Sequence, residues 1–86
     1  MTYTVTYTAR ARRDLQNLPP EAARRIVRSV AGIREDPYRH VRKLAGFSRT
    51  PVYRLRIDRY RVILTIEDER LLILVLEAGH RSSIYR

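Results

Sequence analysis

The chain has 86 residues, of which 44% are hydrophobic, and this length suits one small core rather than two. It contains no cysteine and only two histidines, which excludes disulfides and cysteine-based metal sites, so we expect neither a cofactor nor a metal. The formal net charge is +9, and every basic residue except Lys43 is an arginine. Such a charge on a small domain favours a polyanionic partner, because neutralised phosphates release their counterions.

The sequence offers no sign of a membrane segment or of export. No apolar run approaches the ~20 residues that a bilayer-spanning helix needs. The first residues lack the apolar stretch of a signal peptide. We therefore expect a cytoplasmic protein without membrane contact.

The N-terminal part predicts a strand followed by a short helix. Residues 2–7 alternate threonine with larger apolar side chains, which is typical of a half-buried strand. Thr8 is suited to cap the helix that follows, which the prolines at 19 and 20 end. One face of this helix carries Ala11, Leu15 and Leu18.

A second helix is predicted from Pro20 to about Glu35, where Asp36-Pro37 stops it. Together the two helices form a hairpin with one apolar side. The inner stripe of the second helix is expected to comprise Ala23, Ile26, Val27, Val30 and Ile33. The outward arginines of this helix are Arg24, Arg25 and Arg28.

The C-terminal half predicts a loop followed by three strands. Residues 38–51 show no clear period and predict a loop with a short extended piece. Tight turns at Asp58-Arg59 and around Asp68-Glu69 join the three strands. The predicted strands are 52–57, 60–67 and 71–78. Because the last one is apolar on both faces, it should lie inside the sheet with the helical hairpin covering one side.

The element order β-α-α-β-β-β predicts one α+β domain over residues 1–86. Its sheet is small and mostly antiparallel, and the N-terminal helical hairpin packs on one face.

The hairpin at residues 52–66 places arginines together on the sheet. A two-residue turn at Asp58-Arg59 pairs Arg56 with Arg61 and Arg54 with Ile63. Because side chains alternate between faces, the three arginines share one face, which we call the arginine face. The opposite, core face carries Tyr53, Leu55, Ile57, Tyr60, Val62, Leu64 and Ile66. Like charges placed opposite each other destabilise a sheet by up to ~1 kcal/mol, so the arrangement favours a binding role over a merely solvated surface.

The last residues of the chain should return to the arginine face. Which side chain enters it depends on the second turn: a two-residue turn favours His80, whereas a three-residue turn favours Arg81. Tyr85 is also expected nearby, where its ring could stack on an unpaired base.

Several stretches together resemble the RelE/ParE toxin superfamily, and the resemblance covers nearly the whole chain. They are ARRDLQNLP at 11–19, KLAG at 43–46, VYRLRI at 52–57, YRVILTI at 60–66 and GHRSSIYR at 79–86. The resemblance implies a compact sheet with a helical hairpin and a cognate antitoxin that wraps around the toxin.

The resemblance is to the RelE branch, which cuts mRNA in the ribosomal A site. It implies the catalytic residues Arg54, Arg56, Arg61, Arg81 and Tyr85, with Arg24, Arg25 and Arg28 touching rRNA. Arg56 and Arg61 would stabilise the phosphate oxygens, Arg81 would neutralise or protonate the leaving 5′-oxygen, and Tyr85 would stack the nucleotide. A ribose 2′-OH would attack the adjacent phosphate without a metal.

The first two of these positions depart from the RelE pattern, where lysine is well known. Arg54 and Arg56 stand there instead, and a guanidinium keeps its proton and makes a poor general base. His80 therefore becomes a candidate for the base.

Two other functions fit the same fold. A ParE-like toxin inhibits DNA gyrase without RNA chemistry, and a non-catalytic module would bind nucleic acid alone. The arginine face together with Arg81 and Tyr85 favours the RelE-like reading. Its partners would be the antitoxin, the ribosome and mRNA, and we expect oligomers only with the antitoxin.

Overall fold

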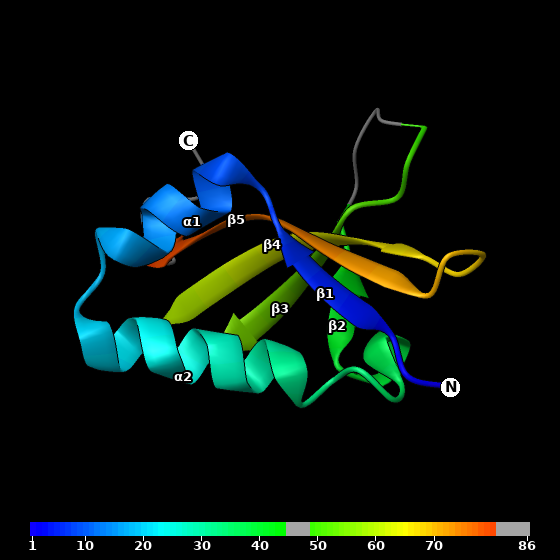
Figure 1. Ribbon diagram of the computed structural model, residues 1–86, viewed down its shortest axis with the longest axis horizontal. Coiled ribbons are helices and arrows are strands. Elements are labelled where there is room, and N and C mark those ends of the chain that lie inside the picture. Colours follow the sequence, from blue (N-terminus) through cyan, green and yellow to red (C-terminus); the bar gives the residue numbers. More distant parts are fainter. Residues whose placement is uncertain (45–48, 81–86) are drawn as a thin grey trace.

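Five strands form one sheet in the computed structural model of the chain, whose described residues are 1–44 and 49–80 (Figure 1). The strand order across the sheet is β1-β5-β4-β3-β2. β1 is parallel to β5, and every other neighbouring pair is antiparallel. The bounds are β1 Thr4–Tyr7, α1 Ala9–Gln16, α2 Pro20–Ala31, β2 Val41–Lys43, β3 Tyr53–Ile57, β4 Tyr60–Glu67 and β5 Leu72–His80.

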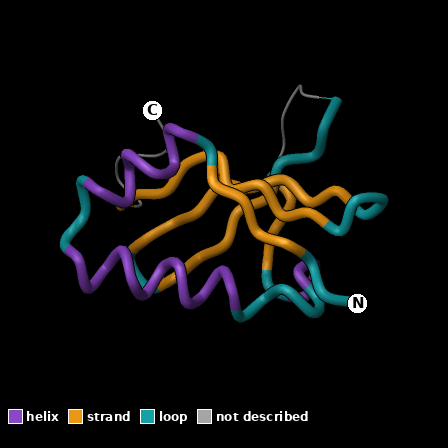
Figure 2. The backbone as a smooth tube through the Cα atoms, viewed as in Figure 1, coloured by secondary structure: helices purple, strands orange, loops and turns teal. Residues whose placement is uncertain are grey.

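This arrangement confirms the predicted α+β class and its mostly antiparallel sheet. The two helices form the expected hairpin, with α1 beside the C-terminal part of β5 and α2 across the end of β3 (Figure 2). The short extended piece predicted within residues 38–51 is β2, which follows a single 3-10 turn at Pro37–Arg39. None of the helices in the described ranges has the length and apolar character required to span a bilayer.

Thr8 caps α1 as the sequence predicts. Its hydroxyl oxygen accepts a hydrogen bond from the backbone N–H of Ala11 at 3.0 Å, and the hydroxyl donates to the carbonyl of Leu76 at 2.9 Å. Further along α1, the carboxylate of Asp14 accepts from the backbone N–H of Ala78 at 3.1 Å. These contacts fasten α1 to β5 beyond the point where β1 ends.

The structure corrects two predictions for α2. The helix ends at Ala31 rather than near Glu35, because Gly32 caps it and the backbone N–H of Ile33 turns back to Val30 in a tighter, three-residue bond. The buried residues of the helix are Ala22, Ile26 and Val30, the predicted Ala23 is only half-buried, and Ile33 is buried just beyond the helix end. Val27 was expected on the inner stripe, yet it is 43% exposed because a helical step of about 100° from Ile26 turns it away from the core.

The core lies between the helical hairpin and one face of the sheet. Leu64, Ile73 and Val75 from the two central strands are fully buried against Ile26 and Val30 of α2. The expected core face of the β3–β4 hairpin is confirmed, since Leu55, Ile57, Val62 and Leu64 are buried, and Tyr53, Tyr60 and Ile66 pack against them partly buried.

At the end of the sheet opposite the β3–β4 turn, Asp68 accepts two tyrosine hydrogen bonds. The hydroxyls of Tyr3 and Tyr38 each donate to Asp68 Oδ1 at 2.7 Å. These bonds lower the pKa of the Asp68 carboxyl, with the Tyr3 bond the larger cause. Three distant segments are thereby joined: the N-terminus, the 3-10 turn and the β4–β5 turn.

Candidate functional site

The arginine face forms in the register that the turn predicts. Ile57 pairs with Tyr60, Arg56 with Arg61, and Arg54 with Ile63. The first turn residue, Asp58, has φ 53°, a left-handed value that a two-residue hairpin turn of this kind requires. Three guanidinium groups from β3 and β4 therefore project from the side of the sheet that the helices leave uncovered.

The three arginines differ in exposure. Arg56 is exposed, whereas Arg54 and Arg61 are half-buried, and the Nε atom of Arg61 is fully buried. Ile63 and Thr65, next along β4 on the same face, are buried at 6% and 7% exposure. Neighbouring side chains thus partly enclose Arg61, and a guanidinium group restricted in this way loses less conformational entropy when it binds an anion.

A fourth arginine, Arg42, joins this face from β2. It pairs directly with Arg54, and its side chain is exposed. The sequence did not single out this residue, because residues 38–51 carry no strand period. The signal that identifies it is the pairing of β2 with β3, which only the fold supplies.

Glu67, at the far end of β4, lies on the same side of the sheet and pairs with Arg70. A second carboxylate, Glu77, lies on the arginine face opposite Ile63. It is half-buried, and Arg10 of α1 reaches its Oε1 at 3.5 Å. Because Arg10 offsets this negative charge, the described part of the face keeps a positive balance.

His80 lies on the core face rather than the arginine face. It pairs with Tyr60, and the two rings meet edge to face with centroids 5.9 Å apart. The turn between β4 and β5 has neither two nor three residues, because four residues separate Glu67 from its partner Leu72. In addition, the pairing of β4 with β5 shifts by one residue between Ile63 and Leu64. These two changes together place Gly79, not His80, opposite Arg61.

The other two predicted catalytic residues, Arg81 and Tyr85, lie outside the described residues. The part of the KLAG stretch at 45–46 lies outside them as well. Their roles stay predictions.

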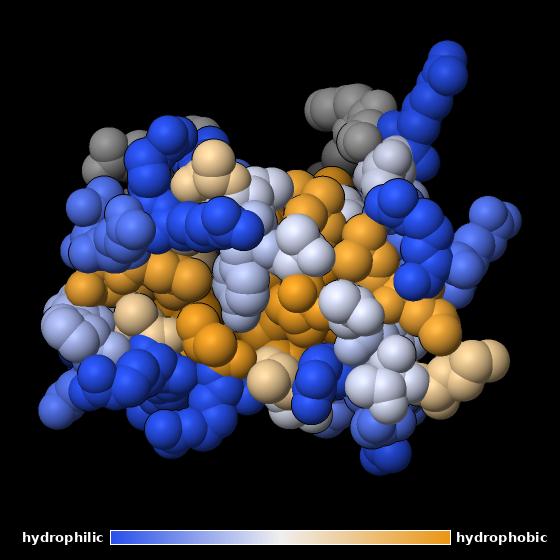
Figure 3. Space-filling model, in the orientation of Figure 1, coloured by the Kyte–Doolittle hydropathy of each residue, from blue (hydrophilic) through white to orange (hydrophobic). Residues whose placement is uncertain are grey.

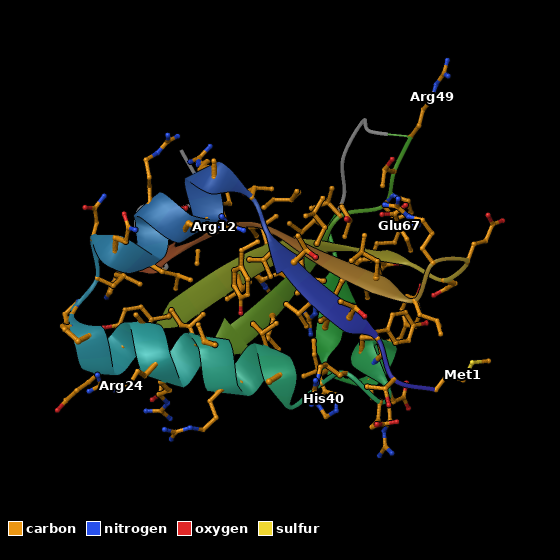
Figure 4. The ribbon with its side chains drawn as sticks, in the orientation of Figure 1. Met1, Arg12, Arg24, His40, Arg49 and Glu67 are labelled. Carbon is orange, nitrogen blue, oxygen red and sulfur yellow. The ribbon has the colours of Figure 1, made fainter. Side chains whose placement is uncertain are left out.

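The α2 arginines are all exposed, but they occupy different surroundings. Arg25 bonds to Asp58 of the β3–β4 turn, with 2.5 Å between Nη1 and Oδ2, and so connects α2 to the hairpin of the arginine face. Arg24 points away from the sheet, as Figure 4 shows, and together with Arg28 it flanks a shallow apolar hollow at Val27. The rRNA contacts of all three arginines stay a prediction.

Val27 also lines a groove between α2 and β1. Its apolar and aromatic walls are Tyr3, which precedes β1, Val5 and Tyr7 on β1, and Ala31 on α2, and polar residues complete the lining: Thr2, Thr4 and Arg34. Figure 3 shows this apolar region surrounded by hydrophilic side chains.

Within residues 1–44 and 49–80, no three histidine, aspartate or glutamate side chains gather where a metal ion could be held.

Comparison with known proteins finds one family and several solved structures. Residues 5–85 match the family described as ParE toxin of type II toxin–antitoxin system, parDE. Toxin RelG of Mycobacterium tuberculosis is 36% identical over 91 residues, covering 100% of this chain and 99% of the relative.

Two solved complexes have the same fold over nearly the whole chain. The toxin–antitoxin complex RelBE2 of M. tuberculosis contains a chain 30% identical, with a TM-score of 0.85 and coverage of 94% of this chain and 100% of that one. The archaeal RelE–RelB complex of Pyrococcus horikoshii is 29% identical, with a TM-score of 0.78 and coverage of 96% and 99%.

Proposed function

The chain belongs to the RelE/ParE superfamily of type II toxin–antitoxin toxins, and from this premise we propose that it is a ribosome-dependent endoribonuclease that cleaves mRNA in the A site. The observation that carries the proposal is the meeting of Arg54, Arg56 and Arg61 on one sheet face. A guanidinium group can donate two parallel hydrogen bonds to the oxygens of one phosphate, and this makes the face suited to an RNA backbone.

The reaction is transfer of the phosphate within the RNA itself. The ribose 2′-oxygen attacks the adjacent phosphorus as the bond to the 5′-oxygen breaks, which leaves a 2′,3′-cyclic phosphate and a free 5′-hydroxyl. The 2′-OH gives up its proton to water, and the leaving 5′-oxygen takes a proton from water. Arg56 and Arg61 hold the non-bridging oxygens, whose negative charge grows in the transition state. Arg81 offsets the negative charge that develops on the leaving 5′-oxygen, and Tyr85 stacks the nucleotide so that the 2′-OH is in line.

We assign no proton abstraction to the arginines, because a guanidinium keeps its proton at any pH the enzyme meets. His80 was the candidate base from sequence, but its ring meets Tyr60 on the opposite side of the sheet. The arginine face therefore contributes binding and charge stabilisation, and orientation of the RNA by the ribosome supplies much of the remaining rate.

The partners of this toxin would be a cognate antitoxin, the ribosome and mRNA. Two of the similar structures were solved as toxin–antitoxin complexes, which supports an antitoxin for this chain as well. A small acidic protein encoded beside this chain should co-purify with it and abolish its activity.

The test is mRNA cleavage with purified ribosomes, in which new 5′ ends are mapped. We expect Arg61→Ala to lose about 10²-fold or more in cleavage rate, the size of effect seen when one charge-stabilising donor is removed. Arg70→Ala is the matched control, because it removes an exposed arginine at the distant β4–β5 turn that pairs with Glu67. Equal cleavage by Arg61→Ala and wild type would contradict the catalytic assignment.

The second candidate is inhibition of DNA gyrase without RNA cleavage. It is favoured by one observation, the match of residues 5–85 to the family described as ParE toxin. Gyrase supercoiling measured with the same protein separates the two functions: inhibition without new mRNA 5′ ends supports the ParE-like one.

A further inference from the structure

Arg42 extends the arginine face onto a third strand. Its backbone pairs with Arg54 in the antiparallel β2–β3 ladder, so the two side chains stand on the same side of the sheet. Arg56 and Arg61 form a second directly opposed pair one strand further on. Two like-charged cross-strand pairs thus lie side by side on one face of the sheet.

One arginine of each pair, Arg42 or Arg56, is exposed and has no carboxylate partner among the described residues. Arg10, Arg25 and Arg70 each contact a carboxylate. Like charges directly opposite each other weaken strand pairing, and a bound polyanion removes that penalty. The arrangement is therefore suited to binding several phosphates of one chain.

We propose that Arg42 binds a backbone phosphate of single-stranded RNA beyond the one adjacent to the scissile phosphate, and so holds the RNA across β4, β3 and β2. Arg42 and Arg61 are two strand spacings and one two-residue step apart, roughly 12 Å between Cα atoms. Because side chains stand nearly perpendicular to a sheet, their guanidinium groups keep a similar separation. Arg42 thus contacts a phosphate further along the same strand, and its role rests on the proposed RNA-cleaving function.

A charged edge strand has another possible purpose, which is to prevent two sheets from pairing edge to edge. β2 provides an internal control for this. Lys43 is the next residue, is equally exposed and carries the same charge, but pairs with Tyr53 on the core face. Either residue could protect the sheet edge through its charge. Of the two, only Arg42 lies on the arginine face, so only Arg42 can bind a phosphate there.

The experiment measures binding of the full chain to a short 2′-O-methyl single-stranded RNA, which cannot react, over a range of salt concentrations. For Arg42→Ala, we expect the slope of log K against log salt to become shallower by about 0.7, the value for one phosphate contact on a single strand. Affinity falls to a similar extent for all RNA sequences, because the contact is to the backbone. Arg42→Lys keeps most of the slope.

Lys43→Ala should leave the slope near that of the wild type. If Arg42→Ala and Lys43→Ala change the slope equally, or neither does, the inference is wrong. That outcome together with ribosomal cleavage that depends on Arg61 leaves the proposed function intact. Conversely, a slope change specific to Arg42→Ala in a protein that cuts no mRNA supports the binding site and overturns the cleavage proposal. Circular dichroism melting of each variant verifies that the fold is retained.

Discussion

The two faces of the sheet use the same strands for opposite purposes. On the core face, Leu55, Val62 and Leu64 are buried under the helices and supply the apolar contacts that stabilise the domain. On the arginine face, residues next to these in the sequence place like charges directly opposite each other, as Arg56 and Arg61 do. Residues that are neighbours in sequence thus act on stability with opposite sign, because strand side chains alternate.

The comparison indicates that stability and proposed activity are separable in this protein. A core-face substitution should change the free energy of unfolding, whereas an arginine-face substitution should change phosphate binding with a small or reversed effect on stability. The following predictions test this separation.

The largest expected effect is on the core face, at Ile26. Ile26→Ala removes a fully buried side chain and should lower the free energy of unfolding by about 2–5 kcal/mol in urea denaturation. Val27→Ala is the matched control, since its side chain is 43% exposed and the loss should stay below about 1 kcal/mol. Equal losses at the two positions would contradict the orientation of α2, in which Ile26 faces the core and Val27 faces away from it.

A smaller effect of opposite sign is expected on the arginine face. Arg56→Thr removes a charge directly opposite Arg61 and should raise the free energy of unfolding by about 0.2–1 kcal/mol at low salt. The same variant should lose mRNA cleavage. The gain should shrink as salt is added, because ions screen exposed charges. A loss of stability instead would mean that the arginine stem packs on the sheet, and that the faces are less separate than proposed.

The smallest effect is at neither face but at the tyrosine contacts of Asp68. Hydrogen bonds from Tyr3 and then Tyr38 lower the pKa of this carboxyl in the folded state. Their contribution is therefore fully present above the unfolded pKa of about 4, and is lost as the pH falls through the lower folded value. Thermal melts between pH 7 and pH 2 should show a shallower acid loss for Asp68→Asn than for wild type.

Glu69→Gln is the control for that experiment, since Glu69 is the exposed neighbour in the same turn. It should keep the acid dependence of the wild type. Identical pH profiles for all three proteins would show that the tyrosine contacts add nothing to stability.

Local patterns in the sequence predicted most of the fold. Alternation identified the strands of the β3–β4 hairpin, and its two-residue turn gave the register that pairs Arg56 with Arg61. Thr8 and the two prolines marked the helix boundaries at the start of the chain. Each of these rests on residues within a few positions of one another, where propensity and turn chemistry decide the outcome.

What the sequence missed depends on contacts between distant segments. The exposure of Val27 depends on which side of α2 faces the sheet, and the pairing of β2 with β3 is what brings Arg42 opposite Arg54. The position of His80 on the core face follows from the four-residue turn between β4 and β5 and from the one-residue shift in their register. Each one-residue change in the pairing moves the side chains of a strand to the other face of the sheet.

The sequence by itself therefore determined the class of the fold, the superfamily and the three arginines of one hairpin. The tertiary structure decided which further groups share their face: it added Arg42, removed His80 and set Glu77 beside Arg10. The physical reason is that hydrogen-bonded pairing over a short turn is local. The order of strands across the sheet is instead set by burial of the whole apolar core.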